Sequence, residues 1–319
     1  MITLHTIASG SEGNCALLSA GDTHLLLDAG ISCRRIAAAL NELGLALSDI
    51  AAVLVTHDHS DHICGLDTMS RRWHIPVCAS PAALRQLAFR IAGIAPLLHE
   101  IECGAPFSLG DFTVTAFPTS HDGHGGVDYR FDCGGASAGA LTDSGYVTEE
   151  ARRVLSGVEL LVLESNHDVE RLRSGPYPYQ LTARILSDHG HLSNDAAAAF
   201  AAELARSGTR QIVLAHLSQE NNTPRLALEA VCAAQTVQTP AIIVVGKVCA
   251  LSEEFAWYEK RPLAGVKVLL TRPKELSSSL AVKLRRRGAE VLELPAIRTE
   301  LTGDIAAVDA ALGRLAAGG

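Results

Sequence analysis

Short runs of apolar residues alternate with glycine, aspartate and serine through the first half of the chain. Such runs are typical of β-strands bounded by turns. We expect strands at Ile2–Ile7, Ala16–Ser19, Thr23–Asp28, Ala52–Thr56, Val77–Ala79 and Phe112–Pro118. Other segments carry apolar side chains three or four positions apart, which is the period of a helix. Helices are expected at Ser32–Leu43, Leu66–Trp73 and Pro81–Ile91.

Strands and helices alternate in the second half of the chain. The expected strands are Leu160–Glu164, Gln211–His216 and Ala241–Val245, and the expected helices are Pro178–Leu186, Ser193–Ser207 and Thr223–Ala234. Hairpins in the first half and alternating elements in the second half together predict an α/β fold. We expect two sheets whose outer faces are covered by helices.

The pattern changes near residue 262, after which two strands and two helices alternate. The strands are expected at Val266–Thr271 and Ala289–Leu294, and the helices at Glu275–Arg287 and Asp304–Ala316. This βαβα unit is Rossmann-like but incomplete, because parallel strands normally need both faces of their sheet covered. The sequence therefore predicts two domains, 1–262 and 263–319.

Composition narrows the class of protein. Hydrophobic residues make up 48% and charged residues 19% of the 319 residues, which excludes a generally disordered chain. No apolar stretch approaches the ~18 residues of a membrane-spanning helix, and the first ten residues do not form a secretory signal. The eight cysteines are scattered without a CxxC pair, so we expect reduced thiols and a cytoplasmic protein.

The net charge of −8 is distributed unevenly. Residues 1–262 carry 18 basic and 29 acidic side chains, whereas residues 263–319 carry 9 basic and 6 acidic ones. The acidic first region argues against nucleic-acid binding driven by the field of the whole protein. Bound divalent cations would offset several of these carboxylates.

Histidine and aspartate side chains cluster directly after the strand expected at 52–56. His57, His59, Asp61 and His62 lie within six residues. Imidazole and carboxylate ligands without thiolate suit Zn²⁺, Mn²⁺ or Fe²⁺. In an extended turn, His57 and His59 can face one side while Asp61 and His62 face another, so the segment can serve two neighbouring ions. A solvated loop with a chance cluster of histidines is the alternative interpretation.

Three further candidate ligands follow other strands. His121 comes after the strand at 112–118, Asp143 after an alanine-rich apolar stretch, and His216 at the end of the strand at 211–216. Each is a lone polar residue with small neighbours at a strand end, where active sites collect their ligands. Taken alone, each is equally compatible with a capping or surface residue.

The order of these motifs resembles the metallo-β-lactamase superfamily, whose signature is HxHxDH followed by a distant His, Asp and His. The resemblance covers residues 1–262, and within the superfamily the chain is most similar to the bacterial YycJ-type subgroup. The segments that carry this similarity are Leu4–Asn14, Leu27–Gly30, Glu164–Asp168, Gly190–Asn194 and His216–Asn222. Membership implies an αββα sandwich with the active site at one edge of the paired sheets.

The family pattern also implies a site for two divalent metal ions, zinc or manganese, with iron as a further option. The implied ligands are His57, His59 and His121 for one ion, Asp61, His62 and His216 for the other, and Asp143 as a bridge between them. A hydroxide shared by the two ions would attack a phosphodiester, and Asp61 counts among the catalytic residues. Asp28 is implied to orient a ligand histidine.

His191 occupies the place of a histidine that is thought to protonate the leaving oxygen in related nucleases. An imidazole that titrates near neutrality suits a general acid, so His191 is a second catalytic candidate. The alternative is a histidine beside the N-cap of the next helix. Ser11, Asn14, His167 and Asn222 are expected to bind substrate, and for His167 a role in orienting a ligand is equally compatible.

The resemblance implies a metal-dependent hydrolase of phosphodiester bonds. A nuclease with 5′-to-3′ exonuclease activity is the leading hypothesis, so the expected partner is nucleic acid, with DNA favoured over RNA, and not a membrane. The runner-up is a phosphodiesterase for a small cyclic phosphate of the phosphoribosyl type. A metal-binding module without activity is the third alternative, against which the complete ligand set argues. The oligomeric state is left open.

Residues 263–319 resemble the beginning of uroporphyrinogen-III synthase. The similarity lies in Val266–Pro273 and Gly288–Pro295 and covers the first two βα units of that family. That enzyme is similar to a two-lobed α/β clamp, of which this segment matches only a part. We therefore expect no synthase activity from it.

Overall fold

The computed structural model describes residues 1–234 and parts of the chain between 262 and 314. The later parts are 262–263, 266–270, 280–281, 283–285, 287, 289–293, 309–310 and 312–314. The strand expected at Ala241–Val245 lies outside the described residues. The chain divides into two units, Met1–Ala250 and Leu251–Gly319, and the domain boundary at residue 262 stays a prediction.

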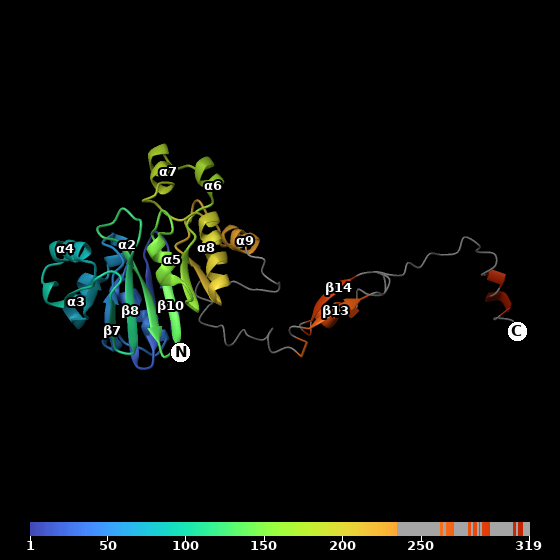
Figure 1. Ribbon diagram of the computed structural model, residues 1–319, viewed down its shortest axis with the longest axis horizontal. Coiled ribbons are helices and arrows are strands. Elements are labelled where there is room, and N and C mark those ends of the chain that lie inside the picture. The colour runs from blue at the N-terminus through green and yellow to red at the C-terminus, as the bar shows by residue number, and fades with distance from the viewer. Residues whose placement is uncertain are drawn as a thin grey trace. The chain divides into compact units, whose positions relative to one another are not determined.

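Two six-stranded sheets form the first unit (Figure 1). The first sheet contains, in spatial order, β1 (Thr3–Ala8), β2 (Cys15–Ala20), β3 (Thr23–Leu27), β4 (Ile50–Leu54), β5 (Val77–Ala79) and β6 (Leu98–Glu100). The second contains β7 (Pro106–Leu109), β8 (Phe112–Pro118), β9 (Val127–Cys133), β10 (Ala136–Leu141), β11 (Leu160–Glu164) and β12 (Gln211–Ala215). Each sheet begins with antiparallel hairpins and ends with parallel strands, from β3 onward in the first sheet and from β10 onward in the second.

Helices cover the outer faces of both sheets. The main helices are α1 (Cys33–Glu42), α3 (Leu66–Trp73), α4 (Pro81–Arg90), α5 (Glu149–Leu155), α8 (Asn194–Ser207) and α9 (Pro224–Ala234). The short helices are η1 (Leu47–Asp49), α2 (Ser60–Ile63), η2 (Ala95–Leu97), α6 (Val169–Ser174) and α7 (Tyr179–Ile185). In Figure 1, α3 and α4 lie on one side of the sheets and α8 and α9 on the other, while α6 and α7 lie together at one end.

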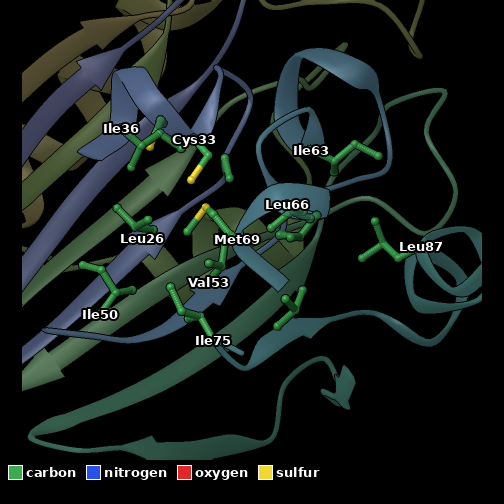
Figure 2. Close-up of a cluster of buried hydrophobic side chains, with 14 of the residues drawn as sticks. Leu26, Cys33, Ile36, Ile50, Val53, Ile63, Leu66, Met69, Ile75 and Leu87 are labelled. Carbon is green, nitrogen blue, oxygen red and sulfur yellow. The ribbon is translucent and has the colours of Figure 1, made fainter. Parts of the chain in front are cut away.

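Three buried clusters of apolar side chains hold these layers together. In the first cluster, Leu66 and Met69 of α3 pack with Leu26 of β3 (Figure 2). Leu25 and Leu27 belong to the second cluster, which lies between the two sheets, because successive strand residues face opposite sides. The third cluster joins the second sheet to α5, α8 and α9. These layers confirm the predicted α/β class and αββα sandwich.

Elements predicted from apolar periodicity within residues 1–234 lie within two residues of the observed bounds. The pattern missed the strands β6, β7, β9 and β10 and the helices α2, α5, α6, η1 and η2. In β9 the reason is a buried polar residue on the strand, Asp128, whose carboxylate accepts hydrogen bonds from the backbone N–H groups of Tyr129 (2.9 Å) and Thr142 (2.7 Å). A strand whose interior contains such a carboxylate does not look like a core strand from hydrophobicity alone.

The second unit contains β13 (Lys267–Leu270) and β14 (Glu290–Glu293), which pair in parallel. Both lie within the strands expected from the sequence. Residues 283–285 and 312–314 are helical and lie within the two expected helices. Among all described residues, no helix combines the length and apolar character that crossing a membrane requires.

Candidate metal centre

Five predicted site residues come shortly after strands of the two sheets. Asp28 follows β3, His57 follows β4, His121 follows β8, Asp143 follows β10 and His216 follows β12. Asp28, Asp143 and His216 have positive φ angles of 60°, 50° and 54°. This conformation is uncommon for residues other than glycine and costs about 1–3 kcal/mol, and such strain clusters at functional sites. The sharp turns direct side chains from both sheets into one place.

The first group of candidate ligands is His57, His59 and His121, which offer nitrogen atoms within 4.8 Å of one another. His59 is the N-cap residue of α2, and its Nδ1 lies 3.0 Å from Nε2 of His57. Nδ1 of His121 donates a hydrogen bond to the carbonyl of Gly190 at 3.0 Å. Because the proton is then on Nδ1, the lone pair of His121 lies on Nε2, where it can coordinate a cation.

The second group is Asp61, His62 and His216, whose ligand atoms also lie within 4.8 Å of one another. Nδ1 of His62 donates to the carboxylate of Asp28 at 2.8 Å. Its Nε2 faces the centre, 3.3 Å from Oδ2 of Asp143 and 3.0 Å from Nδ2 of Asn14. The same carboxylate accepts hydrogen bonds from the backbone N–H (2.8 Å) and the hydroxyl (2.9 Å) of Thr56. Asp28 therefore has the contact that the family resemblance implies.

Asp143 lies between the two groups. It forms a potential ligand set with His57 and His62, and its Oδ1 lies 3.8 Å from Nε2 of His121 and 3.5 Å from Nε2 of His216. Within the described chain, the buried Oδ2 of Asp143 and Nε2 of His216 have no hydrogen-bond partner. Orphaned buried polar atoms are costly, and coordination of a cation would satisfy both of them.

The chemistry of these donors fits divalent cations. Burial raises the pKa of Asp143, but the neighbouring His216 and His62 lower it well below its usual value, so the carboxylate is ionised. Burial lowers the pKa of His57 well below its usual value, so this ring is neutral and keeps a lone pair. Burial lowers the pKa of His62 and of His216, but neighbouring carboxylates raise both above the usual value. Ionised carboxylates and neutral imidazoles are the forms that bind metals, so a bound cation would replace a proton on each of these two rings. The donor set suits zinc, manganese or iron.

Glu164, the last residue of β11, is a site residue to which the sequence assigned no role. Its fully buried carboxylate accepts hydrogen bonds from Nδ1 of His191 at 2.8 Å and from Nδ1 of His216 at 3.1 Å. It also accepts bonds from the backbone N–H groups of Ser144 and Leu192. Burial raises the pKa of Glu164, but the charge and hydrogen bond of His191 lower it to about 2. The feature of the sequence that could have identified Glu164 is an apolar strand that ends in a glutamate.

His191 lies beside both ligand groups. Its ring centroid is 5.0 Å from that of His121 and 5.2 Å from that of His216. Burial lowers the pKa of His191, but the Glu164 carboxylate raises it more strongly, to about 9. With Nδ1 held by Glu164, the other ring nitrogen is available to a molecule at the centre. The structure thus brings the predicted catalytic residues, Asp61 and His191, to the same centre.

The four expected substrate contacts have different surroundings. Ser11 is exposed in the turn between β1 and β2, and Nδ2 of Asn14 lies 3.0 Å from Nε2 of His62. His167 is buried, which lowers its pKa to about 4, and neither ring nitrogen has a hydrogen-bond partner in the described chain. Asn222 is also buried, and its amide donates to two backbone carbonyls at 2.7 and 3.1 Å. Contrary to expectation, Asn222 fixes loops in the interior instead of facing a substrate.

Comparisons with known proteins agree with this fold. The model of the beta-lactamase superfamily domain matches residues 23–217. Exodeoxyribonuclease YycJ of Bacillus anthracis is 38% identical over 222 residues, which cover 69% of this chain and 84% of that protein. The crystal structure of the metallo-beta-lactamase fold protein YhfI from Bacillus subtilis has a TM-score of 0.59 and 20% identity, covering 77% of this chain and 96% of that one.

A shorter similarity concerns porphyrin biosynthesis protein HemD of Ruminiclostridium josui, which is 59% identical over 61 residues. These residues are 19% of this chain and 12% of that protein. The match agrees with the resemblance of the C-terminal segment to uroporphyrinogen-III synthase.

The superfamily model covers more than half of the chain, so the chain belongs to the beta-lactamase superfamily. The predicted class of enzyme, a metal-dependent hydrolase, is confirmed by this membership and by the similarity to YycJ. The fold implies binding of divalent metal. The described residues offer four overlapping groups of candidate ligands at this centre: the two groups above, the set of His57, His62 and Asp143, and the set of Asp143, Glu164, His191 and His216.

Proposed function

We propose that this chain is a nuclease that removes nucleotides from an end of DNA with the help of two divalent cations. The observation that carries the proposal is the position of the Asp143 carboxylate between the two ligand groups. It forms a potential ligand set with His57 and His62, and its Oδ1 lies 3.8 Å from Nε2 of His121 and 3.5 Å from Nε2 of His216. Two-metal sites of this kind are typical of phosphodiester hydrolysis. The similarity to an exodeoxyribonuclease over 84% of that protein supports DNA as the substrate. A cytoplasmic location stays a prediction.

The proposed ligands are His57, His59 and His121 for one cation, Asp61, His62 and His216 for the other, and Asp143 for both. Zinc and manganese fit these donors, and iron is compatible with them. When bound, the cations activate water as a nucleophile and neutralise charge that develops on the phosphoryl oxygens.

Two buried carboxylates fix the orientation of the ligand histidines. Asp28 accepts the Nδ1 proton of His62, and Glu164 accepts that of His216. Each bond keeps the proton on Nδ1 and turns Nε2 toward the centre, and such partners also raise the basicity of the ligand. The chain thereby prepares its ligands before a cation arrives.

His191 serves as the proposed general acid. Without metal, the Glu164 carboxylate raises the pKa of His191 to about 9, above the neutral range expected from the sequence, and the same ionised carboxylate holds the ring in place through Nδ1. The remaining N–H, at Nε2, can pass a proton to the leaving oxygen of the broken phosphodiester. Glu164 then keeps the neutral ring in the same orientation for the next turnover.

The test is a set of substrates assayed with one metal-loaded sample. We expect stepwise release of mononucleotides from single- or double-stranded DNA, and loss of this activity after chelation of the metal. Hydrolysis of a ribose cyclic phosphate without cleavage of DNA would overturn the proposal in favour of the runner-up. Hydrolysis of RNA alone would reassign the substrate, and two bound ions without any hydrolysis would identify a metal-binding module.

A further inference from the structure

A cavity of about 170 Å³ adjoins the metal centre, between the α7 segment and the turn that precedes α8. Tyr177, Leu181 and Ile185 line it from the α7 segment, and His121 and His191 line it from the metal centre. A molecule in this cavity therefore touches a candidate metal ligand and the proposed general acid at the same time.

Two hydrogen bonds to backbone carbonyls connect the walls of the cavity. The carbonyl of Ile185, at the end of α7, accepts a bond from the N–H of His191 at 3.1 Å. The carbonyl of Gly190 accepts the bond from Nδ1 of His121. The distance from the α7 wall to the reacting centre is thus set by the fold, which is what positioning a substrate requires.

The polarity of the cavity identifies its occupant. Arg184, which also lines the cavity, donates to the carboxylate of Asp122 at 2.6 Å, so its charge is already compensated and the α7 wall does not attract a bare anion. The rest of the α7 wall is the ring of Tyr177 and two aliphatic side chains, while the opposite wall presents the imidazoles of His121, His189 and His191. The α7 wall suits a flat, uncharged ring. The volume is below the roughly 300–1,000 Å³ of pockets for drug-sized ligands, which leaves room for a single ring system.

We infer that this cavity binds the base of the nucleotide whose phosphate lies at the metal centre, with Tyr177 as the stacking residue. The inference rests on the proposed nuclease function. It names the contact by which the enzyme would select the end of a DNA strand. Stacking on an aromatic side chain tolerates every base, because each base has a π-face. Room for one base admits one nucleotide beside the centre, as removal of single nucleotides requires.

The chain offers a matched pair of tyrosines for the test. Tyr177 lines the cavity, whereas Tyr179, two residues later, is 85% exposed and lies outside it. The assay compares kcat/KM for an oligodeoxynucleotide with kcat/KM for the same oligonucleotide carrying an abasic terminal nucleotide, tested at each end. The ratio of the two values does not depend on the fraction of correctly folded enzyme, so a partly unfolded variant still gives an answer.

For the wild type we expect the intact end to be preferred roughly 5- to 150-fold, the range that loss of one stacked base produces. Tyr177→Ala should reduce this ratio towards one, and so should Leu181→Trp, which fills the cavity. Tyr179→Ala should keep the wild-type ratio. A second measurement, calorimetric binding of a deoxynucleoside monophosphate compared with deoxyribose 5-phosphate, should show the same pattern in metal-loaded protein.

A wild type that degrades DNA but cleaves abasic and intact ends equally would overturn the base-binding cavity and leave the nuclease function standing. Equal effects of Tyr177→Ala and Tyr179→Ala would overturn it as well. Failure of the wild type to cleave any oligonucleotide, while it hydrolyses a cyclic phosphate, would instead overturn the nuclease function itself.

Discussion

The two ligand groups of the metal centre differ in how the protein holds them. In the group of Asp61, His62 and His216, both histidines are buried. Each donates its Nδ1 proton to a buried carboxylate, that of Asp28 or Glu164. These carboxylates are themselves fixed by further hydrogen bonds.

In the group of His57, His59 and His121, the Nδ1 atoms of His57 and His121 contact the Thr56 hydroxyl and the Gly190 carbonyl, each at 3.0 Å, instead of a buried carboxylate. The side chain of His59 is 33% exposed. Here the nearby carboxylate is Asp122, which is 30% exposed and lies 3.7 Å from Nε2 of His59 and 3.4 Å from Nε2 of His121. Buried partners orient and polarise a ligand more strongly than exposed ones. The comparison therefore teaches that one cation should be retained firmly and the other should exchange more readily.

Asp143→Ala should have the largest effect, because the Asp143 carboxylate lies within 3.8 Å of His121 in one group and 3.5 Å of His216 in the other. The metal content should fall from two ions towards none, and DNA hydrolysis should fall below detection. Elemental analysis and the nuclease assay on the same sample check this. If the variant retains two ions and turns over normally, Asp143 is not a metal ligand and does not link the two groups.

His191→Ala should leave a cation bound to each ligand group, because His191 is a ligand of neither cation in the proposed arrangement. Loss of a general acid costs roughly 10²- to 10⁴-fold in rate, so kcat for DNA should fall by this factor at unchanged metal content. The loss should shrink for a nitrophenyl phosphodiester, whose leaving group needs no proton. Equal losses on both substrates would show that His191 positions the substrate instead of protonating it.

Asp28→Asn tests the firmly held group. The amide cannot accept every hydrogen bond that the carboxylate accepts from His62 and Thr56. Replacement of such a partner typically costs about 10- to 100-fold in metal affinity or activity. Titration with a competing chelator should show one of the two ions released more easily than in the wild type. Unchanged release of both ions would refute the idea that buried carboxylates set the difference between the groups.

The parts of the molecule that the sequence predicts are those encoded locally. His57, His59, Asp61 and His62 stand within six residues, so their spacing alone indicates a metal site. Strand ends are equally local, because an apolar run and the turn after it fix where a strand stops. This is why the sequence alone predicts the main strands and the ligands at their ends.

The features that the sequence does not predict depend on contacts between segments that are distant in the chain. Glu164 binds histidines 27 and 52 residues away in the sequence, and no periodicity records such a contact. The sequence predicts α7 as a helix, but its place beside His191 follows from a hydrogen bond between two segments. The side-chain amide of Asn222 could contact a substrate as far as the sequence shows. Only the structure shows that this amide is buried and donates to the backbone carbonyls of Ser165 and Asn166.

Asp122→Asn tests the loosely held group and should have a smaller effect than Asp28→Asn. The carboxylate is partly exposed, and exposed charge pairs contribute about 0.2–1 kcal/mol, which is at most about fivefold in affinity. The same chelator titration should show a modest increase in release of one ion. An effect larger than that of Asp28→Asn would reverse the order of the two groups.

Deletion of residues 263–319 should have the smallest effect of all. Every candidate ligand lies at or before His216, and their hydrogen-bond partners Asp28, Glu164 and Gly190 precede it too. Metal content and the rate of DNA hydrolysis should therefore stay nearly unchanged in the truncated protein. Solubility should improve, because apolar side chains such as Leu292, which is 61% exposed, are removed. Loss of either cation on truncation would show that the C-terminal segment supports one of the two groups, and the exchange rates of the two ions would then identify which one.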